Sequence, residues 1–315
     1  MPPLVVGFAG DTSFTHGLSS YDPFGEVTGL LSAPDLTLIN LETTIAEADV
    51  GHAYAKKYTF KSPPESTGLL VAAGIDGVAL GNNHLLDFGQ PALFRTMELL
   101  DEAEVARAGA GTDKKEAYAP MVFEVAGRRV AVVSFSRILS QPAWAADIDR
   151  AGIASAYEDW IPSTVQAIQV AGLNADLVAV MVHWGIELNY CPESYQRELA
   201  TAWVEAGADL VVGSHPHVLQ GVEQIGDAWV VYSTGNFAFP SARGLSDDGA
   251  IFEFAVDETG ISLTARPLHI ITGRPHPATN EQKSMIFELL SEHSFGVVFD
   301  ETGRAVPAEE PGKCG

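Results

Sequence analysis

The chain has 315 residues, of which 46% are hydrophobic and 19% charged, as in soluble globular proteins. This length allows a full hydrophobic core, in one large domain or two small ones. The formal net charge of −23, from 41 acidic and 18 basic residues, argues against nucleic acid, an anionic membrane surface or a long polyanion as partner. Part of this acidity could hold divalent cations.

The two cysteines, Cys191 and Cys314, lie far apart along the chain. They predict neither a disulfide framework nor a cysteine-type zinc cluster, and we interpret Cys191 as an inert thiol. The first residues lack the basic region of a signal peptide, and no apolar run reaches transmembrane length. We therefore expect a cytoplasmic protein without a membrane partner.

In the first half of the chain, short apolar runs each end at polar residues. Such runs over 4–9, 36–39 and 77–80 predict buried strands, and they lead into Gly10-Asp11, Asn40-Leu41-Glu42 and Gly81-Asn82-Asn83-His84. Helical periodicity marks 66–73 and 91–104. Residues 121–136 predict a hairpin that turns at 126–128.

The second half repeats one pattern, in which an amphipathic helix precedes an Ala-Asp-Leu-Val strand that ends in histidine. Helices are predicted over 162–171 and 192–206, and strands over 177–182 and 210–212. The strands lead into His183-Trp184-Gly185 and Gly213-Ser214-His215-Pro216-His217. A strand over 229–232, a hairpin over 251–268 and a helix over 280–290 follow.

Strands that alternate with helices predict an α/β fold, and the hairpins favour two facing mixed sheets flanked by helices. We expect one domain over 1–270, with 271–315 as a C-terminal extension packed on it. The last residues of this extension are expected to be flexible.

Residues able to bind metal follow five separate predicted strands. The carboxyl ends of strands in an open α/β sheet lie along one rim, so these side chains are expected to converge. A set of nitrogen and oxygen ligands without thiolate suits Mn²⁺, Fe²⁺, Zn²⁺, Mg²⁺ or Ca²⁺. The set comprises Asp11, Glu42, Asn83 with His84, His183, and His215 with His217.

These motifs, together with Ser233-Thr234-Gly235-Asn236-Phe237, resemble those of the CapA family. CapA proteins are poly-γ-glutamate capsule proteins within the calcineurin-like metallophosphoesterase superfamily. The resemblance covers about residues 4 to 240 and implies a four-layer α-β-β-α sandwich of the metallo-dependent phosphatase type. It also implies one or two divalent ions, such as Mn, Ca, Mg or Zn, and no organic cofactor.

The resemblance further implies a role for each residue. Glu42 would bridge two metals, Asp11 and His217 would complete one ion, and Asn83, His183 and His215 would complete the other. His84 would stay off the metal as acid/base group, oriented by Asp87. The sequence departs from the superfamily where Asp-x-His becomes Asp11-Thr12-Ser13, and where Asn40-Leu41-Glu42 replaces the bridging Asp motif.

Several functions fit this pattern: phosphoester hydrolysis, action on poly-γ-glutamate, metal-assisted acid/base chemistry on a peptide, and a non-catalytic binding subunit. We favour the third, since soluble CapA-like proteins similar to this one act as epimerases in lasso-peptide biosynthesis. A divalent ion would acidify the Cα–H of a C-terminal residue, and His84 with Asp11 or His293 would move the proton. Candidate substrate-binding residues are Trp184, Glu187, Asn236 and Phe237.

Overall fold

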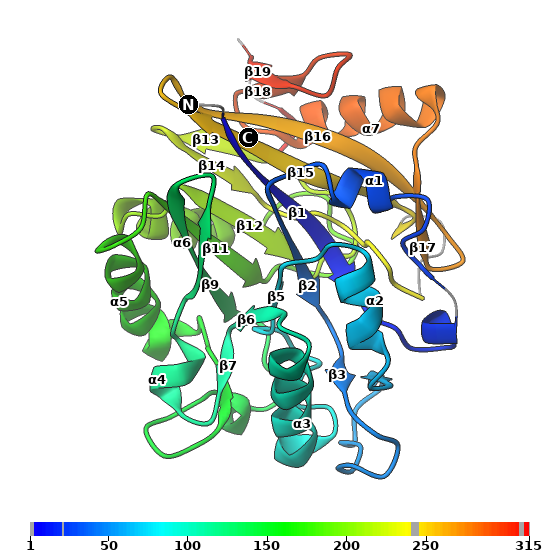
Figure 1. Cartoon of the computed structure of the whole chain (residues 1–315). Coiled ribbons are helices and arrows are strands. Elements are labelled where there is room, and N and C mark those ends of the chain that lie inside the picture. The colour runs from blue at the N-terminus through cyan, green and yellow to red at the C-terminus, as the bar shows by residue number, and fades with distance from the viewer. Residues whose placement is uncertain (1–2, 21, 241–245, 309–311, 315) are drawn as a thin grey trace.

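The fold is a pair of facing β-sheets with helices on the outer faces, seen in a computed structural model (Figure 1). The structure describes residues 3–20, 22–240, 246–308 and 312–314. One sheet has the order β17 (Arg274–Pro277), β16 (Gly260–Ile271), β15 (Asp248–Asp257), β1 (Leu4–Thr12), β2 (Leu36–Leu41), β5 (Gly77–Ala79) and β6 (Ala106–Ala108). The other has the order β13 (Val222–Ile225), β14 (Ala228–Val231), β12 (Leu210–Ser214), β11 (Leu177–His183), β9 (Arg128–Ser136) and β8 (Met121–Val125).

Alternation along the strands divides the apolar residues among three cores. On β9, Val130 and Val132 face the space between the sheets, whereas Ala131 and Val133 face outward. The outer face of the second sheet is covered by α5 (Ile161–Gly172) and α6 (Ser194–Glu205), and that of the first by α2 (Ser66–Ala72) and α3 (Gly89–Glu102). The expected four-layer α-β-β-α architecture is thereby confirmed.

The predicted elements correspond closely to those observed. The hairpins expected over 121–136 and 251–268 are β8–β9 and β15–β16, and the four predicted helices of the outer layers are α2, α3, α5 and α6. Short elements complete the layers: α1 (Thr28–Leu31), α4 (Lys114–Ala117), β3 (Thr44–Ile45) paired with β4 (Lys61–Ser62), and β7 (Ala110–Gly111) paired with β10 (Gly152–Ile153). The connections also contain the 3-10 turns η1 (Leu18–Ser20), η2 (Pro142–Trp144) and η3 (Glu158–Trp160).

Four of the parallel strands are each preceded by an aspartate, which hydrogen-bonds to the neighbouring strand and fixes their pairing. Its carboxylate accepts a hydrogen bond from the backbone N–H of the second residue of the neighbouring strand, and its own N–H donates to the carbonyl of that residue. The carboxylate contacts measure 2.7–2.8 Å and the backbone ones 2.7–3.0 Å. The pairs are Asp35 with Val5, Asp76 with Thr37, Asp176 with Arg129, and Asp209 with Val178.

These aspartate clamps explain the Ala-Asp-Leu-Val repeat of the second half, and they act in both sheets. Each clamp sets the register of a parallel pair at the amino ends of its strands. Because register is fixed there, the carboxyl ends of β1, β2, β11 and β12 finish at one rim.

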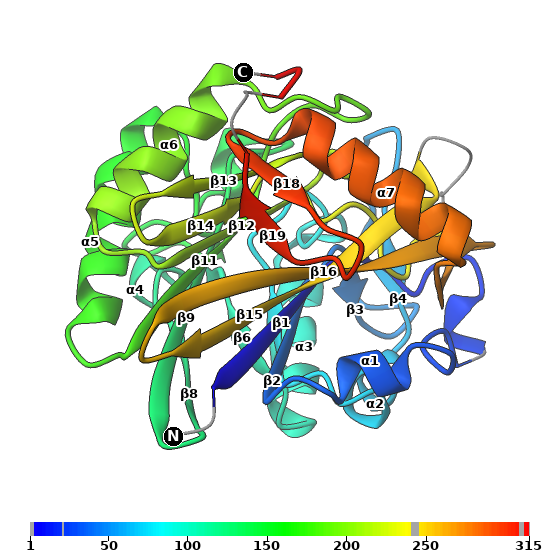
Figure 2. The ribbon, with the colours of Figure 1, turned by 90° about the horizontal axis from the view of Figure 1, so that it is seen from above.

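The C-terminal segment packs over β16, as the view from above shows (Figure 2). It contains α7 (Asn280–His293) and the hairpin of β18 (Val297–Phe299) and β19 (Ala305–Pro307). Ile286 and Leu290 of α7 join the core between the sheets. The expected flexible end falls partly on 309–311 and 315, which lie outside the described residues.

The expectation for the cysteines was wrong. Cys191 and Cys314 form a disulfide, with Cα atoms 5.4 Å apart across a sequence separation of 123 residues. Sequence spacing could not reveal this pair, since only the path of the C-terminal segment brings Cys314 beside the loop that carries Cys191.

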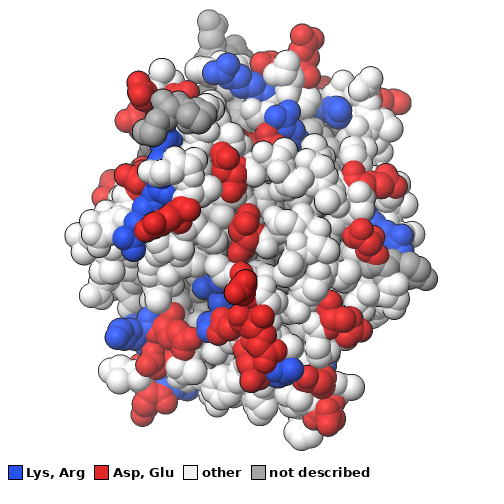
Figure 3. All heavy atoms as spheres, in the orientation of Figure 1, with Lys and Arg blue, Asp and Glu red and all other residues white. Residues whose placement is uncertain are grey.

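Acidic side chains are spread over the face shown in Figure 3, with a run down its middle and fewer basic groups among them. This distribution is in line with the formal net charge of −23. Across the described part of the chain, no helix combines the length and the apolar character that a membrane crossing demands.

The clamp at Asp209 gives a test of register control. Asp209→Ala would leave the buried N–H of Val178 without its acceptor, so we expect a loss of about 1–3 kcal/mol in unfolding free energy. Burial raises the pKa of Asp209, which shows that this position disfavours a charge. The neutral amide oxygen in Asp209→Asn can still accept the bond, so this variant should lose less unfolding free energy. Urea denaturation of both variants measures the difference; equal losses would contradict the clamp.

Candidate metal centre and acid/base site

The side chains expected to converge do so around Glu42, which follows β2. Three imidazole nitrogens surround its Oε1 atom: His183 Nε2 at 3.5 Å, His84 Nε2 at 3.7 Å and His217 Nε2 at 3.9 Å. His183 ends β11, and His217 follows β12 in the motif Gly213-Ser214-His215-Pro216-His217. Residues from both sheets thus share one buried carboxylate.

Glu42 is a carboxylate whose burial is compensated only in part by its neighbours. It is fully buried, and neither of its oxygens has a hydrogen-bond partner among the described residues. Burial raises the pKa of Glu42 well above its usual range, and the nearby carboxylate of Asp11 adds to the rise. Such a group is satisfied by a cation, so the residues present fit the divalent ion that the sequence motifs imply.

Asp11, at the end of β1, is held by three donors. Asn40 Nδ2 donates to its Oδ1 at 2.7 Å, and His217 Nδ1 and the backbone N–H of His215 reach its Oδ2 at 3.1 and 3.2 Å. Burial acts to raise the pKa of Asp11, but the bonds with His217 and Asn40 outweigh it and lower that pKa. Asp11 is therefore a fixed anion, suited to a ligand and not to a mobile base.

Each histidine is oriented by the nitrogen that faces away from Glu42. His217 Nδ1 donates to Asp11 and to Asn236 Oδ1, the latter at 2.9 Å. His183 Nδ1 contacts Ser214 Oγ at 3.0 Å. In both, Nε2 is left on the Glu42 side, as is usual for metal-binding imidazoles whose other nitrogen is hydrogen-bonded.

The possible ligand atoms form two groups that share Glu42. One joins Glu42, His215 and His217, the other joins Asp11, Glu42 and His183, and the atoms of each group lie within 4.8 Å of one another. We call these five residues the Glu42 cluster. This agrees with Glu42 as the shared ligand, although the expected division had placed Asp11 with His217. Asn83 Oδ1 lies 2.9 Å from His183 Nε2, on the ligand side of that ring.

His215 is ready to act as a neutral ligand, whereas His217 holds a proton. Burial lowers the pKa of His215 to about 3, and its Nδ1 has no partner among the described residues. Although burial opposes it, the charge of Glu42 and the bond to Asp11 raise the pKa of His217 to about 10. A cation bound beside Glu42 would replace this proton as the balancing charge.

The loop of the His215–His217 motif has a strained backbone. His215 has φ of 95° and His217 has φ of 56°, both in the left-handed region that disfavours residues with a Cβ. Gly213 just before them lies against another strand, where an added Cβ would meet Tyr232 O at 2.1 Å. This tight packing holds both imidazoles at the rim.

His84 forms a separate dyad with Asp87. His84 Nδ1 lies 2.7 Å from Asp87 Oδ2, and Lys56 Nζ lies 2.5 Å from Asp87 Oδ1. The imidazole stacks on Phe60, with ring centroids 4.1 Å apart. Burial lowers the pKa of His84, against the opposing effect of Asp87, so the ring is neutral with Nε2 directed at the Glu42 cluster.

Three of the expected substrate-binding residues have other places in the structure. Trp184 and Phe237 are fully buried, with Trp184 stacked on Trp203 and Phe237 on Phe24, so they belong to the cores. Asn236 uses both ends of its amide within the protein, on His217 and on the carbonyl of Ser246. It orients a candidate ligand and has no free end for substrate.

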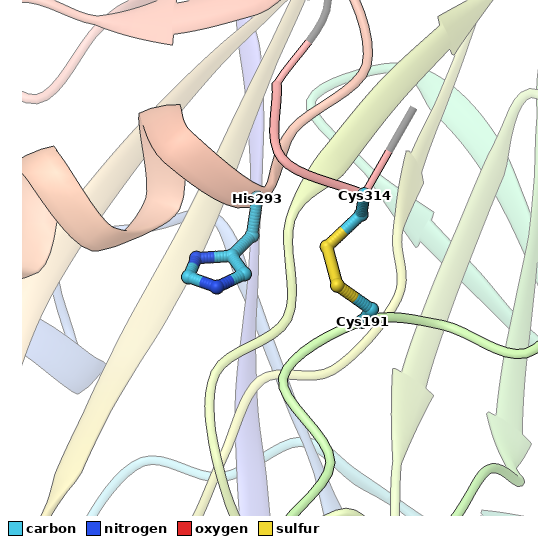
Figure 4. A group of neighbouring side chains, drawn as sticks. All are labelled: Cys191, His293 and Cys314. Atoms are coloured by element: carbon cyan, nitrogen blue, oxygen red, sulfur yellow. A yellow bond between two sulfur atoms is a disulfide. The ribbon is translucent and has the colours of Figure 1, made fainter.

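Of two further predicted residues, one is exposed and the other is half-buried. Glu187 is exposed in the loop after β11. His293, expected as a possible second base, ends α7 and lies beside Cys191 and Cys314 (Figure 4). Its described contacts are with Leu289, Tyr190 and this pair of cysteines, and none is with the Glu42 cluster.

Sequence reasoning missed residues that position the site. Lys56 comes from the loop between β3 and β4, where no apolar run or motif drew attention to it. Asn40 belongs to the motif in which only Glu42 was predicted to be functional. Its amide makes hydrogen-bond contacts with Asp11, Asn82 and His183. Ser214, likewise within a known motif, fixes His183.

Comparison with known proteins agrees with this geometry. The model of a family described as bacterial capsule synthesis protein PGA_cap matches residues 5–241, which include every member of the Glu42 cluster. The chain belongs to this family. His293 and the disulfide partner Cys314 lie outside the matched region.

Relatives are found in several bacteria. The chain is 32% identical to the capsule biosynthesis protein CapA of Bacillus anthracis, over 76% of this chain and 57% of that protein. It is 28% identical to the PGA biosynthesis protein CapA of Bacillus subtilis, over 86% of this chain and 72% of that protein. The chain thus spans little more than half of the first relative.

A solved structure has the same fold. It is described as a novel phosphatase from Mycoplasma pneumoniae and superposes with a TM-score of 0.53, at 13% identity, over 85% of this chain and 94% of that one. This likeness concerns the fold, and it confirms the expected phosphatase-like architecture.

The geometry makes His217 a candidate metal ligand and places His84 in the dyad with Asp87. Measurements of metal binding can test this division. His217→Ala should weaken Mn²⁺ binding at least tenfold, because it removes a ligand candidate and the partner of Asp11, whereas His84→Gln should retain the metal. Metal content after dialysis and calorimetric titration measure both. The control is His269→Gln on β16, a half-buried histidine that pairs with Asp248 and belongs to neither ligand group. Loss of metal in His84→Gln would overturn the division.

Proposed function

We propose that this protein is a metal-dependent acid/base enzyme that acts on a peptide, and that it inverts the Cα of a residue next to a carboxylate. The observation that carries the proposal is the dyad of His84 and Asp87, which faces the Glu42 cluster without belonging to either candidate ligand group. A purely structural metal site has no need of a buried proton-transfer group beside it.

His84 has the state that a general base requires. Its lowered pKa keeps the ring neutral, and the bond from Nδ1–H to Asp87 leaves the lone pair on Nε2. Nε2 lies 3.7 Å from Glu42 Oε1, so a substrate atom held at the cluster is within reach of the ring. His84 would then take the Cα proton.

A divalent ion bound by Glu42 and its neighbours would polarise the substrate carboxylate or amide oxygen and so acidify the Cα–H. Lys56 supports the base from the other side. Its ammonium contacts Asp87 and the carbonyl of Asn83, and it lies 3.3 Å from His84 Nδ1. This contact holds the Asp87 side chain in place, and Asp87 in turn orients His84.

Asp11 and His293 are poor candidates for the second proton-transfer group. Asp11 is held by three donors, and His293 contacts other residues. In the proposed reaction, the hydrogen that returns to the opposite face of the Cα therefore comes from solvent.

The charge pattern supports a peptide over a phosphoester or a nucleic acid. Among the described residues, Lys56 is the cation hydrogen-bonded into the site, and the chain as a whole carries a formal net charge of −23. Because Lys56 already pairs with Asp87, the single carboxylate of a peptide would be held by the divalent ion, whereas phosphoryl transfer usually relies on several cationic groups. We expect neither nucleic acid nor a membrane surface as partner.

Hydrolysis of an amide bond is the second candidate, because relatives are described as capsule or PGA biosynthesis proteins. The same dyad would serve it, with His84 handling the proton of water or of the leaving amine. Epimerisation brings a solvent hydrogen to the Cα, whereas hydrolysis brings a solvent oxygen to the new carboxylate.

Isotope exchange distinguishes the candidates. Incubation with peptides ending in a free carboxylate, in D₂O, should give one deuterium at a single Cα, and chelator should abolish this uptake. Peptide mass spectrometry and chiral analysis of the hydrolysed product measure it. If poly-γ-glutamate is instead shortened in H₂¹⁸O with one ¹⁸O per cleavage, hydrolysis replaces epimerisation as the function.

Substitution of Lys56 tests the support of the dyad. Lys56→Met should lower kcat with little change in metal content, because Asp87 loses the cation that contacts it at 2.5 Å. Lys56→Arg should restore much of the rate. The nearby Lys57→Met, whose ammonium lies over the ring of Tyr58, is the matched control. An unchanged kcat in Lys56→Met would remove Lys56 from the mechanism.

A further inference from the structure

Cys191, Cys314 and His293 form a second group of possible metal ligands, separate from the Glu42 cluster. Their ligand atoms lie within 4.8 Å of one another, and all three residues are half-buried. They come from the loop between β11 and α6, from the C-terminal end of the chain and from the last residue of α7, as Figure 4 shows. In the disulfide form the sulfurs are bonded to each other and are weak ligands.

His293 has the orientation of a metal-binding imidazole. Its Nδ1–H donates to the carbonyl of Leu289 at 2.7 Å, which fixes the tautomer and leaves the lone pair on Nε2. The ring of Tyr190 lies at a centroid distance of 5.6 Å, next to the loop residue Cys191. The nitrogen that remains available is thus in the same neighbourhood as the two sulfurs.

Hydrogen bonds anchor the segment of each cysteine independently of the S–S bond. Near Cys314, the N–H of Gly312 donates to Ser294 O and that of Lys313 to Glu292 O, at 3.2 and 2.5 Å. On the other side, the carbonyl of Cys191 accepts from Gln220 Nε2 at 3.2 Å. Reduction would therefore leave both thiols close to His293.

We propose that reduction of the Cys191–Cys314 disulfide creates a site for Zn²⁺, in which both cysteines and His293 are the ligands. A dithiol or phosphine reductant supplies two electrons, and two protons complete the two thiols. Zn²⁺ then binds both thiolates and His293 Nε2, the two protons are released, and water fills the fourth position. The site goes beyond the proposed function, since it shares no ligand with the Glu42 cluster.

The dimensions and chemistry suit this ion. At Zn–S distances of about 2.3 Å, tetrahedral thiolates lie roughly 3.8 Å apart. Rotation of the side chains provides this separation over Cα atoms 5.4 Å apart. Two thiolates with an imidazole select a borderline ion such as Zn²⁺, whereas the nitrogen and oxygen ligands around Glu42 also accept harder ions.

Cobalt provides a readout specific for sulfur. The full-length protein is titrated with Co²⁺ after reduction with a phosphine and, in parallel, in the disulfide form. Only the reduced protein should develop a thiolate-to-cobalt charge-transfer band, saturating at one equivalent, and Zn²⁺ should bleach it. The Glu42 cluster cannot give this band, because its ligands are nitrogen and oxygen.

Variants identify the ligands. Cys314→Ser, with Cys191 still present, should reduce the band and weaken binding at least tenfold, and His293→Gln should shift the band and weaken binding. His276→Gln on β17, which pairs with Glu26, is the matched control and should bind as the unsubstituted protein does. Circular dichroism confirms that each variant is folded.

The absence of a band in the reduced protein would overturn the proposal. So would a band that Cys314→Ser leaves unchanged. Neither result bears on the isotope experiment, which reports on His84 and the Glu42 cluster alone.

Discussion

The buried carboxylate of Glu42 is the constraint on which the site depends. An anion in this position, without a hydrogen-bond donor among the described residues, is costly unless a cation lies beside it. The three imidazoles around it answer this need in part, through the protonated His217. A bound divalent ion would answer it fully, and the Nε2 atoms of His183 and His217 lie on the Glu42 side, where they could bind one.

The fold and most of the candidate ligands were predictable from the sequence, because both rest on a simple pattern. Apolar runs of strand length stop at polar residues, and parallel strands finish at a common rim. Asp11, Glu42, His183 and His217 could therefore be brought together without coordinates. The dyad of His84 and Asp87 was accessible in the same way, because its members lie three residues apart.

Other features depend on the path of loops, which carries no periodic signal. Lys56 reaches Asp87 from a loop without a motif, and Cys314 reaches Cys191 only because α7 and the segment after it fold back over β16. For the aromatic residues, a position beside a ligand in the sequence wrongly suggested contact with the substrate. Trp184 stands next to a ligand in sequence, but at a strand end successive side chains face opposite ways, which sends its indole into the outer core.

The aspartate clamps place the determinants of sheet register at the end of the strands opposite to the metal centre. The residues that set strand pairing and the residues proposed for catalysis thus lie at opposite ends of the same strands. Loops at the rim can therefore change the ligands that they carry while strand pairing stays intact. This separation gives one scaffold the freedom to diversify its reactions during evolution.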